Sequence, residues 1–192
     1  MKRFLLLALA LAVLHIPAMA FGQGGTIAVF ADPIGEDCHP RDVAPGILQV
    51  YVVHTNTEGV TASQFMVRTG DGFEGVYLGE YLADPNDVAI GDAFAGVQMG
   101  YGECLSAPIH LITMSFYVTG SSPECCYFEV VEYPRSDPPG INAVDCDMNL
   151  VDAEGGTTFV NPDGNCVCDV PGGPTPVELT TWSRVKAMYA GN

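Results

Sequence analysis

The chain has 192 residues, of which 48% are hydrophobic and 16% are charged, with a mean hydropathy of +0.23. This size and apolar content fit one globular domain with an appendage, and they exclude both a multidomain enzyme and a disordered acidic tail. Twenty-three acidic residues against seven basic ones give a net charge of −16. That charge excludes nucleic acid and anionic membrane surfaces as partners, because both are bound by cationic side chains.

Residues 1–20 are expected to be a secretory signal peptide. Lys2 and Arg3 form a basic start, residues 4–14 are an unbroken apolar run, and Ala18-Met19-Ala20 supplies the small residues that a signal peptidase recognises. The apolar run is too short for a transmembrane helix, which needs about 20 residues. We therefore expect a secreted or cell-surface protein with no integral membrane span.

Residues 21–170 are expected to form an all-β domain, since no helical stripe interrupts a series of short β-rich runs bounded by turn residues. The runs are residues 26–31, 47–54, 62–68, 73–81, 94–99, 109–118, 125–133, 141–146, 157–161 and 166–170. Their spacing predicts an antiparallel β-sandwich of nine or ten strands, with a hairpin connection across residues 161–165. The run 109–118 has apolar residues on both faces near its start, which predicts a central strand.

Seven cysteines follow the signal peptide: Cys38, Cys104, Cys125, Cys126, Cys146, Cys166 and Cys168. Export would place them in an oxidising compartment, so we expect disulfides, and an odd number leaves one unpaired within the chain. Adjacent strand residues face opposite ways, so either Cys125 or Cys126 is expected in the core. Cys166 and Cys168 would share a face, which suits two bridges to neighbouring segments or one thiolate metal site. The spacing leaves the connectivity open.

An acidic segment near residue 150 alternates oxygen donors as an EF-hand loop does, through Asp145, Asp147, Asn149 and Asp152. It departs from that loop at Leu150, where a glycine is required, and at Gly156, where a glutamate is required. Two interpretations stay open, a structural Ca²⁺ site and a solvated acidic turn. No other cofactor is expected.

The C-terminal segment differs from the domain in composition. Residues 171–179 are a Pro/Gly-rich linker, and residues 180–192 are expected to form a short amphipathic helix. Trp182, Val185 and Tyr189 follow helical spacing, whereas Arg184 and Lys186 lie off that stripe. A helix of this length is marginal in water alone. It is therefore expected either to pack on the domain or to act as a docking or sorting segment for export or cell-surface machinery.

No catalytic signature is present: the sequence lacks a Gly-x-Ser-x-Gly elbow, a His-Glu-x-x-His helix and a phosphate-binding Gly-x-x-x-x-Gly-Lys loop. His39, His54 and His110 are expected at the surface or at strand ends. We therefore expect a non-catalytic extracellular module with a structural or protein-interaction role. The alternative is a calcium-assisted carbohydrate- or protein-binding module, in which exposed rings would stack on the ligand; the candidates are Tyr77, Tyr81, Tyr101, Tyr127 and Tyr133.

Two stretches resemble known proteins. The order of a long early strand (47–54), a Gln64-Phe65-Met66-Val67 strand, a Gly-rich strand (96–100) and the strand 109–118 resembles cohesin-type and carbohydrate-binding sandwiches. This resemblance implies an Ig-like or cohesin-like sandwich and an extracellular protein or glycan as partner. The ending Thr180-Thr181-Trp182-Ser183-Arg184-Val185-Lys186-Ala187-Met188-Tyr189 resembles that of uncharacterised secreted bacterial proteins and implies a bacterial source.

Overall fold

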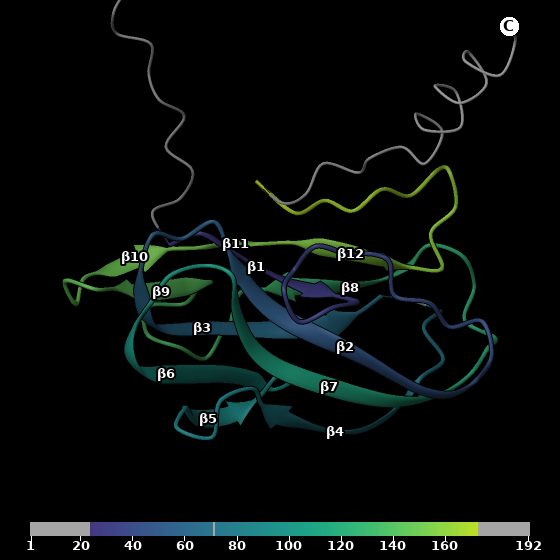
Figure 1. Ribbon diagram of the computed structural model, residues 1–192, viewed down its shortest axis with the longest axis horizontal. Coiled ribbons are helices and arrows are strands. Elements are labelled where there is room, and N and C mark those ends of the chain that lie inside the picture. The colour runs from purple at the N-terminus through teal and green to yellow at the C-terminus, as the bar shows by residue number, and fades with distance from the viewer. Residues whose placement is uncertain (1–23, 71, 173–192) are drawn as a thin grey trace, which may run out of the picture.

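The computed structural model describes residues 24–70 and 72–172, which form two β-sheets packed face to face (Figure 1). The strands are β1 (Thr26–Phe30), β2 (Pro45–Thr55), β3 (Val60–Thr69), β4 (Val76–Leu82), β5 (Val88–Asp92), β6 (Gly96–Leu105), β7 (Ile109–Thr119), β8 (Cys126–Val131), β9 (Asn142–Asp145), β10 (Leu150–Asp152), β11 (Glu154–Gly155) and β12 (Thr157–Val160). This arrangement confirms the predicted all-β sandwich. Among the described residues, no helix is long and apolar enough to cross a membrane. The predicted signal peptide and C-terminal helix lie outside the described residues.

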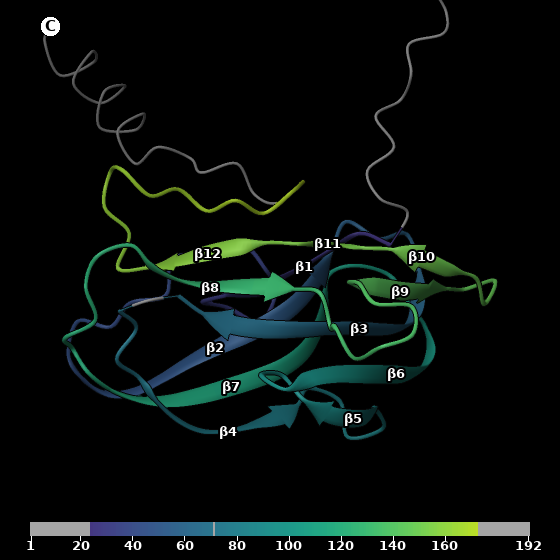
Figure 2. The same ribbon diagram turned by 180° about the vertical axis from the view of Figure 1, so that it is seen from behind.

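The twelve strands of the described residues are divided between the two sheets. The first sheet has the order β11-β1-β2-β7-β4, in which β1 and β11 run parallel. The second has the order β10-β9-β3-β6-β5, and the second half of β3 also pairs with β8, which pairs with β12. Figure 1 looks onto β2, β7 and β4, and Figure 2 looks onto β3, β6 and β9. β7 lies between β2 and β4, so the predicted central strand is confirmed.

Every predicted strand except residues 166–170 overlaps an observed one. Residues 161–165 turn the chain back along β12 as predicted, but the returning segment makes only an isolated antiparallel bridge, between Asp169 and Thr157, so the predicted strand 166–170 is wrong. The physical reason is that Cys166 and Cys168 bond to two different neighbouring segments, and the backbone follows these bonds instead of a ladder. The short strands β5, β10 and β11 were not predicted, because they lie among turn-forming or acidic residues.

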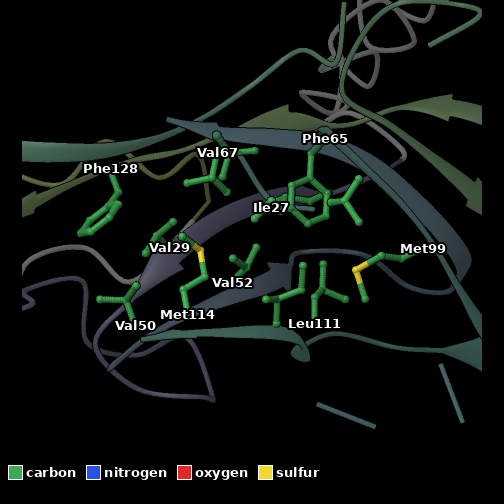
Figure 3. Packing of buried hydrophobic residues seen from close by; sticks show 14 of the residues in the cluster. Ile27, Val29, Val50, Val52, Phe65, Val67, Met99, Leu111, Met114 and Phe128 are labelled. Atoms are coloured by element: carbon green, nitrogen blue, oxygen red, sulfur yellow. The ribbon is translucent and has the colours of Figure 1, made fainter. Parts of the chain in front are cut away.

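The core lies between the sheets and consists of inward-facing aliphatic and aromatic side chains. Figure 3 shows Ile27 and Val29 of β1 facing Phe65 and Val67 of β3 across the interior. At one end of the core, the fully buried ring of Phe116 packs against several other rings, those of Phe73, Tyr77, Phe94 and Phe128. Each fully buried large apolar side chain contributes about 1.5–3 kcal/mol, so the register of the strands is strongly specified.

A second, smaller core covers the outer side of β1 and β2. Phe30 and Val53 pack there against Cys38 and the partly buried Cys168 and Val170, which belong to segments outside the sheets. Asp42 in the first of these segments is buried, and its carboxylate accepts hydrogen bonds from the backbone N–H groups of Gly120 and Ser122. β1 and the second half of β2 are therefore shielded from solvent on both sides.

His54 lies near the end of β2, but it is fully buried, which the sequence did not indicate. Its Nε2 atom donates a hydrogen bond to the carbonyl oxygen of Gly24 at 2.5 Å, and its Nδ1 atom has no partner. Burial lowers the pKa of His54 to about 4, partly offset by the bond to Gly24. The neutral ring thus links Gly24, at the start of the domain, to β2 through a hydrogen bond.

This burial predicts that acid destabilises the fold. The unfolded chain takes up a proton on His54 near pH 6.5, whereas the folded chain does so only near pH 4. The free energy of unfolding should therefore fall, by about 3 kcal/mol from this residue, as the pH is lowered between these values. Urea unfolding at pH 7 and pH 4.5 measures the change. In the control His54→Gln, whose amide can donate to Gly24, the change should be clearly smaller; an equal change in both proteins contradicts the prediction.

Candidate binding surface

Six of the seven cysteines form three disulfides, and all seven lie within the described residues. The pairs are Cys38–Cys168, Cys104–Cys146 and Cys125–Cys166, with Cα–Cα distances of 6.2, 5.5 and 5.8 Å. Cys126 is free and buried beside the bonded Cys125, as the alternation of strand side chains predicted. Cys166 and Cys168 make the two separate bridges that were one of the two alternatives.

For the other alternative, a thiolate metal site, the cysteine sulfur atoms are already bonded in disulfides. Two groups of three possible ligand atoms lie within 4.8 Å of one another among the described residues. One adds His39 to Cys38 and Cys168, and the other adds Asp163 to Cys125 and Cys166. Each group contains a disulfide, and a bonded sulfur is not the thiolate that binds zinc. The geometry favours a structural role for both groups.

A thiol count should give three disulfides and one protected thiol. Burial raises the pKa of the Cys126 thiol, so it is both inaccessible and protonated in the folded protein. Iodoacetamide should label no cysteine in the native protein, one after denaturation without reductant, and seven after reduction, as read by intact mass. Labelling of Cys126 in the native protein, or more than one adduct before reduction, contradicts this arrangement.

The acidic segment forms the tight hairpin between β9 and β10. The Asp145 carboxylate accepts hydrogen bonds from the backbone N–H groups of Asp147 and Asn149 and from the Asn149 side chain. These bonds, that of the Asn149 side chain first, lower the pKa of Asp145. Asp152 lies at the far end of β10, opposite Asn142. Three of the four predicted calcium ligands thus share one turn, and Asp152 is separated from it along the strand.

Calcium binding by this hairpin stays a prediction. If Asp145, Asp147, Asn149 and Asp152 hold Ca²⁺, the ion should raise the melting temperature, because it would bind the folded chain only. Thermal melts with millimolar Ca²⁺ and with EDTA test this, and Asp147→Asn provides the control. An identical melting temperature in both solutions removes the calcium site.

The outer face of the second sheet carries a row of apolar residues across all five strands. Paired positions on neighbouring strands place side by side Leu150, Val144, Ala62, Gly100 and Val88. The residues at the ends are large and exposed, with 52% of Leu150 and 65% of Val88 accessible. Those in the middle are small, so the side chains extend further from the sheet at its edges than at its centre.

The small central residues leave a hollow of about 310 Å³ on this face. Ala62 and Gly100 form its floor, with Val88 and Ile90 on one side and Val144 and Leu150 on the other. A Cβ atom added at Gly100 would meet nothing within 4 Å, so the space above it is open. The lining is mostly apolar, and apolar surface exposed in this way is characteristic of interaction sites.

A second row, next to the first, is built from amide side chains. Gln98 donates a hydrogen bond to Gln64 at 3.2 Å, and Gln64 donates to the carbonyl oxygen of Pro138 at 2.9 Å and to the hydroxyl of Ser136 at 3.0 Å. These contacts fix the loop between β8 and β9 along one side of the hollow. The position of Gln64 is therefore set before any ligand binds.

Each edge of this face carries an aspartate. Asp152 follows Leu150 by two residues on β10 and lies on the same side of that strand. Asp92 is the last residue of β5, the opposite edge strand, where its carboxylate accepts hydrogen bonds from the backbone N–H groups of Phe94 and Ala95. The apolar hollow is thus bordered by negative charge at both edges. Sequence reasoning selected Asp152 for calcium, and it did not select Ala62, Gly100 or Val88, because their role depends on the register of strands distant in sequence.

No model of a known protein family matches this chain, and no curated protein matches it. The solved structures that match this chain include several cohesin modules. The cohesin module of a family 33 glycoside hydrolase from Clostridium perfringens has a TM-score of 0.48 and 8% identity, over 72% of this chain and 98% of that one. The non-cellulosomal cohesin of Archaeoglobus fulgidus has a TM-score of 0.43 and 18% identity, over 70% and 89%. A type I cohesin–dockerin complex from Clostridium thermocellum gives a TM-score of 0.43 and 13% identity, over 71% and 99%.

The predicted docking or sorting residues Trp182, Arg184, Val185, Lys186 and Tyr189 lie outside the described residues. Their role in contacting export or cell-surface machinery stays a prediction.

Proposed function

We propose that the chain is a secreted, non-catalytic module that binds a protein partner on the outer face of the β10-β9-β3-β6-β5 sheet. The hollow over Ala62 and Gly100 carries this proposal, because it presents preformed apolar surface between exposed Val88 and Leu150. A partner side chain inserted there would bury apolar area, which is worth about 25 cal/mol per Å². The fixed side chain of Gln64 lowers the ordering cost of binding.

The charges around the hollow define the partner's chemistry. Asp152 and Asp92 border the hollow on opposite edges of the face, and the chain as a whole carries a net charge of −16. A partner should therefore present an aliphatic or aromatic residue flanked by lysine or arginine. Such opposite charges accelerate association and reject acidic partners.

A location outside the cell is supported by the disulfides. Three of them form among the described residues, and disulfides persist in oxidising compartments but are rare in the cytosol. A non-catalytic role is supported by the lining of the hollow, which consists of apolar residues, amides and Ser63, whose buried hydroxyl accepts a hydrogen bond from Tyr101. The lining contains no carboxylate, imidazole or amine that could transfer a proton or activate this hydroxyl.

Panning a phage-displayed random peptide library on the immobilised full chain tests the proposal. Peptides with an aliphatic or aromatic residue beside Lys or Arg should be enriched, and high salt should weaken their binding. Gly100→Leu should reduce the affinity of an enriched peptide at least roughly tenfold, because the new side chain occupies the hollow.

The substitution at Gly100 is suited to this test because it should leave the fold intact. Its Cβ position is open, and glycine within a strand is less stabilising than a larger residue. The control is Tyr117→Ala on the opposite sheet, which should bind the peptide as the wild type does. Enriched peptides that bind Gly100→Leu unchanged would refute the proposed site.

A further inference from the structure

The first sheet also has an exposed face, over β2, β7 and β4, the three strands that lie in front in Figure 1. Strand pairing arranges its outward residues in three rows. The rows are Ile47, Tyr117 and Val76; Gln49, Ser115 and Gly79; and Tyr51, Thr113 and Tyr81. Larger side chains thus stand at both ends of the face, and the middle row is polar and small. The two outer rows are four residues apart on β7, or roughly 13 Å.

This face is free of charge in a strongly acidic protein. The three strands contain one charged residue, Glu80. Its carboxylate accepts hydrogen bonds from the Ala93 backbone N–H at 3.1 Å and from the Tyr77 hydroxyl at 2.7 Å, which binds it to the turn before β6 in the other sheet. The charge is therefore turned toward the gap between the sheets, and the rows themselves are neutral.

Thr113 and His110 lie beside the rings at one end of the face. Thr113 is fully buried between Tyr51 and Tyr81, and its hydroxyl forms a hydrogen bond with Nε2 of His110 at 2.9 Å. The ring of Tyr51 meets the ring of His110 edge-on, with 5.3 Å between their centroids. Tyr81 stays 53% exposed, and Tyr117 in the opposite row stays 46% exposed. The face thus combines accessible aromatic rings with hydroxyl and amide groups.

We infer that the β2-β7-β4 face is a second binding surface, separate from the hollow, and that its ligand is a neutral polysaccharide. The C–H faces of sugar rings pack against tyrosine rings, while sugar hydroxyls exchange hydrogen bonds with groups such as Gln49 and Ser115. The ring of Tyr117 in one outer row and the ring of Tyr81 in the other are far enough apart that a polymer, and not a single sugar, contacts both. The absence of charge on the rows suits an uncharged chain.

The charges argue against a second copy of the protein on this face. Sheets packed face to face lie about 10 Å apart, which is close to the screening length in physiological salt. Two chains of charge −16 would therefore bring their acidic surroundings within unscreened range of each other. Glu74 and Asp84, near the two ends of β4, are among the groups that would be opposed. A neutral polymer meets no such repulsion.

Affinity gel electrophoresis of the full chain tests the inference, with xyloglucan, mixed-linkage β-glucan, glucomannan and xylan in the gel, and alginate as the charged control. At least one neutral polysaccharide should retard the protein, alginate should not, and 0.5 M NaCl should leave the retardation unchanged. The variants Tyr81→Ala and Tyr117→Ala should each weaken binding by roughly tenfold, the loss that corresponds to one aromatic contact.

Matched variants separate this surface from the hollow. Tyr117→Phe, which keeps the ring, should retain binding, and so should Ile90→Ala and Gly100→Leu on the other sheet. The inference is wrong if none of the four neutral polysaccharides retards the protein, or if the alanine variants bind as the wild type does. It is also wrong if light scattering detects a dimer that Tyr117→Ala dissociates, since a second copy would then cover the face. None of these results bears on the peptide-binding test.

Discussion

The burial of β1 on both of its faces is the constraint on which the arrangement of the molecule depends. All five residues of β1 are buried, with Ile27 and Val29 in the main core and Ala28 and Phe30 in the smaller one. A strand at this position needs a cover on the outer side of its sheet, and the segments joined by Cys38 and Cys168 supply it. This cover occupies β1 and the second half of β2, and it leaves the first half of β2, β7 and β4 accessible. The position of the candidate surface on the first sheet follows from it.

The two uncovered faces differ in the physical basis of recognition. On the second sheet, small residues at Ala62 and Gly100 create depth, and aspartates at the edges add a long-range attraction for cations. The rows on the first sheet form no such hollow and carry no charge. Their tyrosine rings, with hydroxyl and amide groups between them, provide the contact area. A single domain can therefore serve ligands of unrelated chemistry without competition, because the core separates the two faces.

Local patterns predicted what depends on local chemistry. The alternation in β7 and the burial of Cys126 at the start of β8 follow from the two-residue period of a strand. The hollow did not follow, because Ala62, Gly100, Val88 and Leu150 become neighbours only through the register of separate strands. The burial of His54 was missed for the same reason: its partner, Gly24, belongs to a segment thirty residues earlier. The connectivity of the disulfides could not be predicted either, because it depends on which distant segments the fold brings together.

The Cys38–Cys168 bond also determines how the domain carries mechanical load. Its two cysteines are 130 residues apart in sequence, and the described chain begins and ends only a short way outside them. Both ends lie close together, since the Pro171 carbonyl accepts a hydrogen bond from Thr26. A pulling force applied between residues 24 and 172 therefore passes along residues 24–38, across the sulfur atoms and out along residues 168–172. Only β1 can be peeled away, while the strands that carry both faces lie inside a covalent loop and bear no tension.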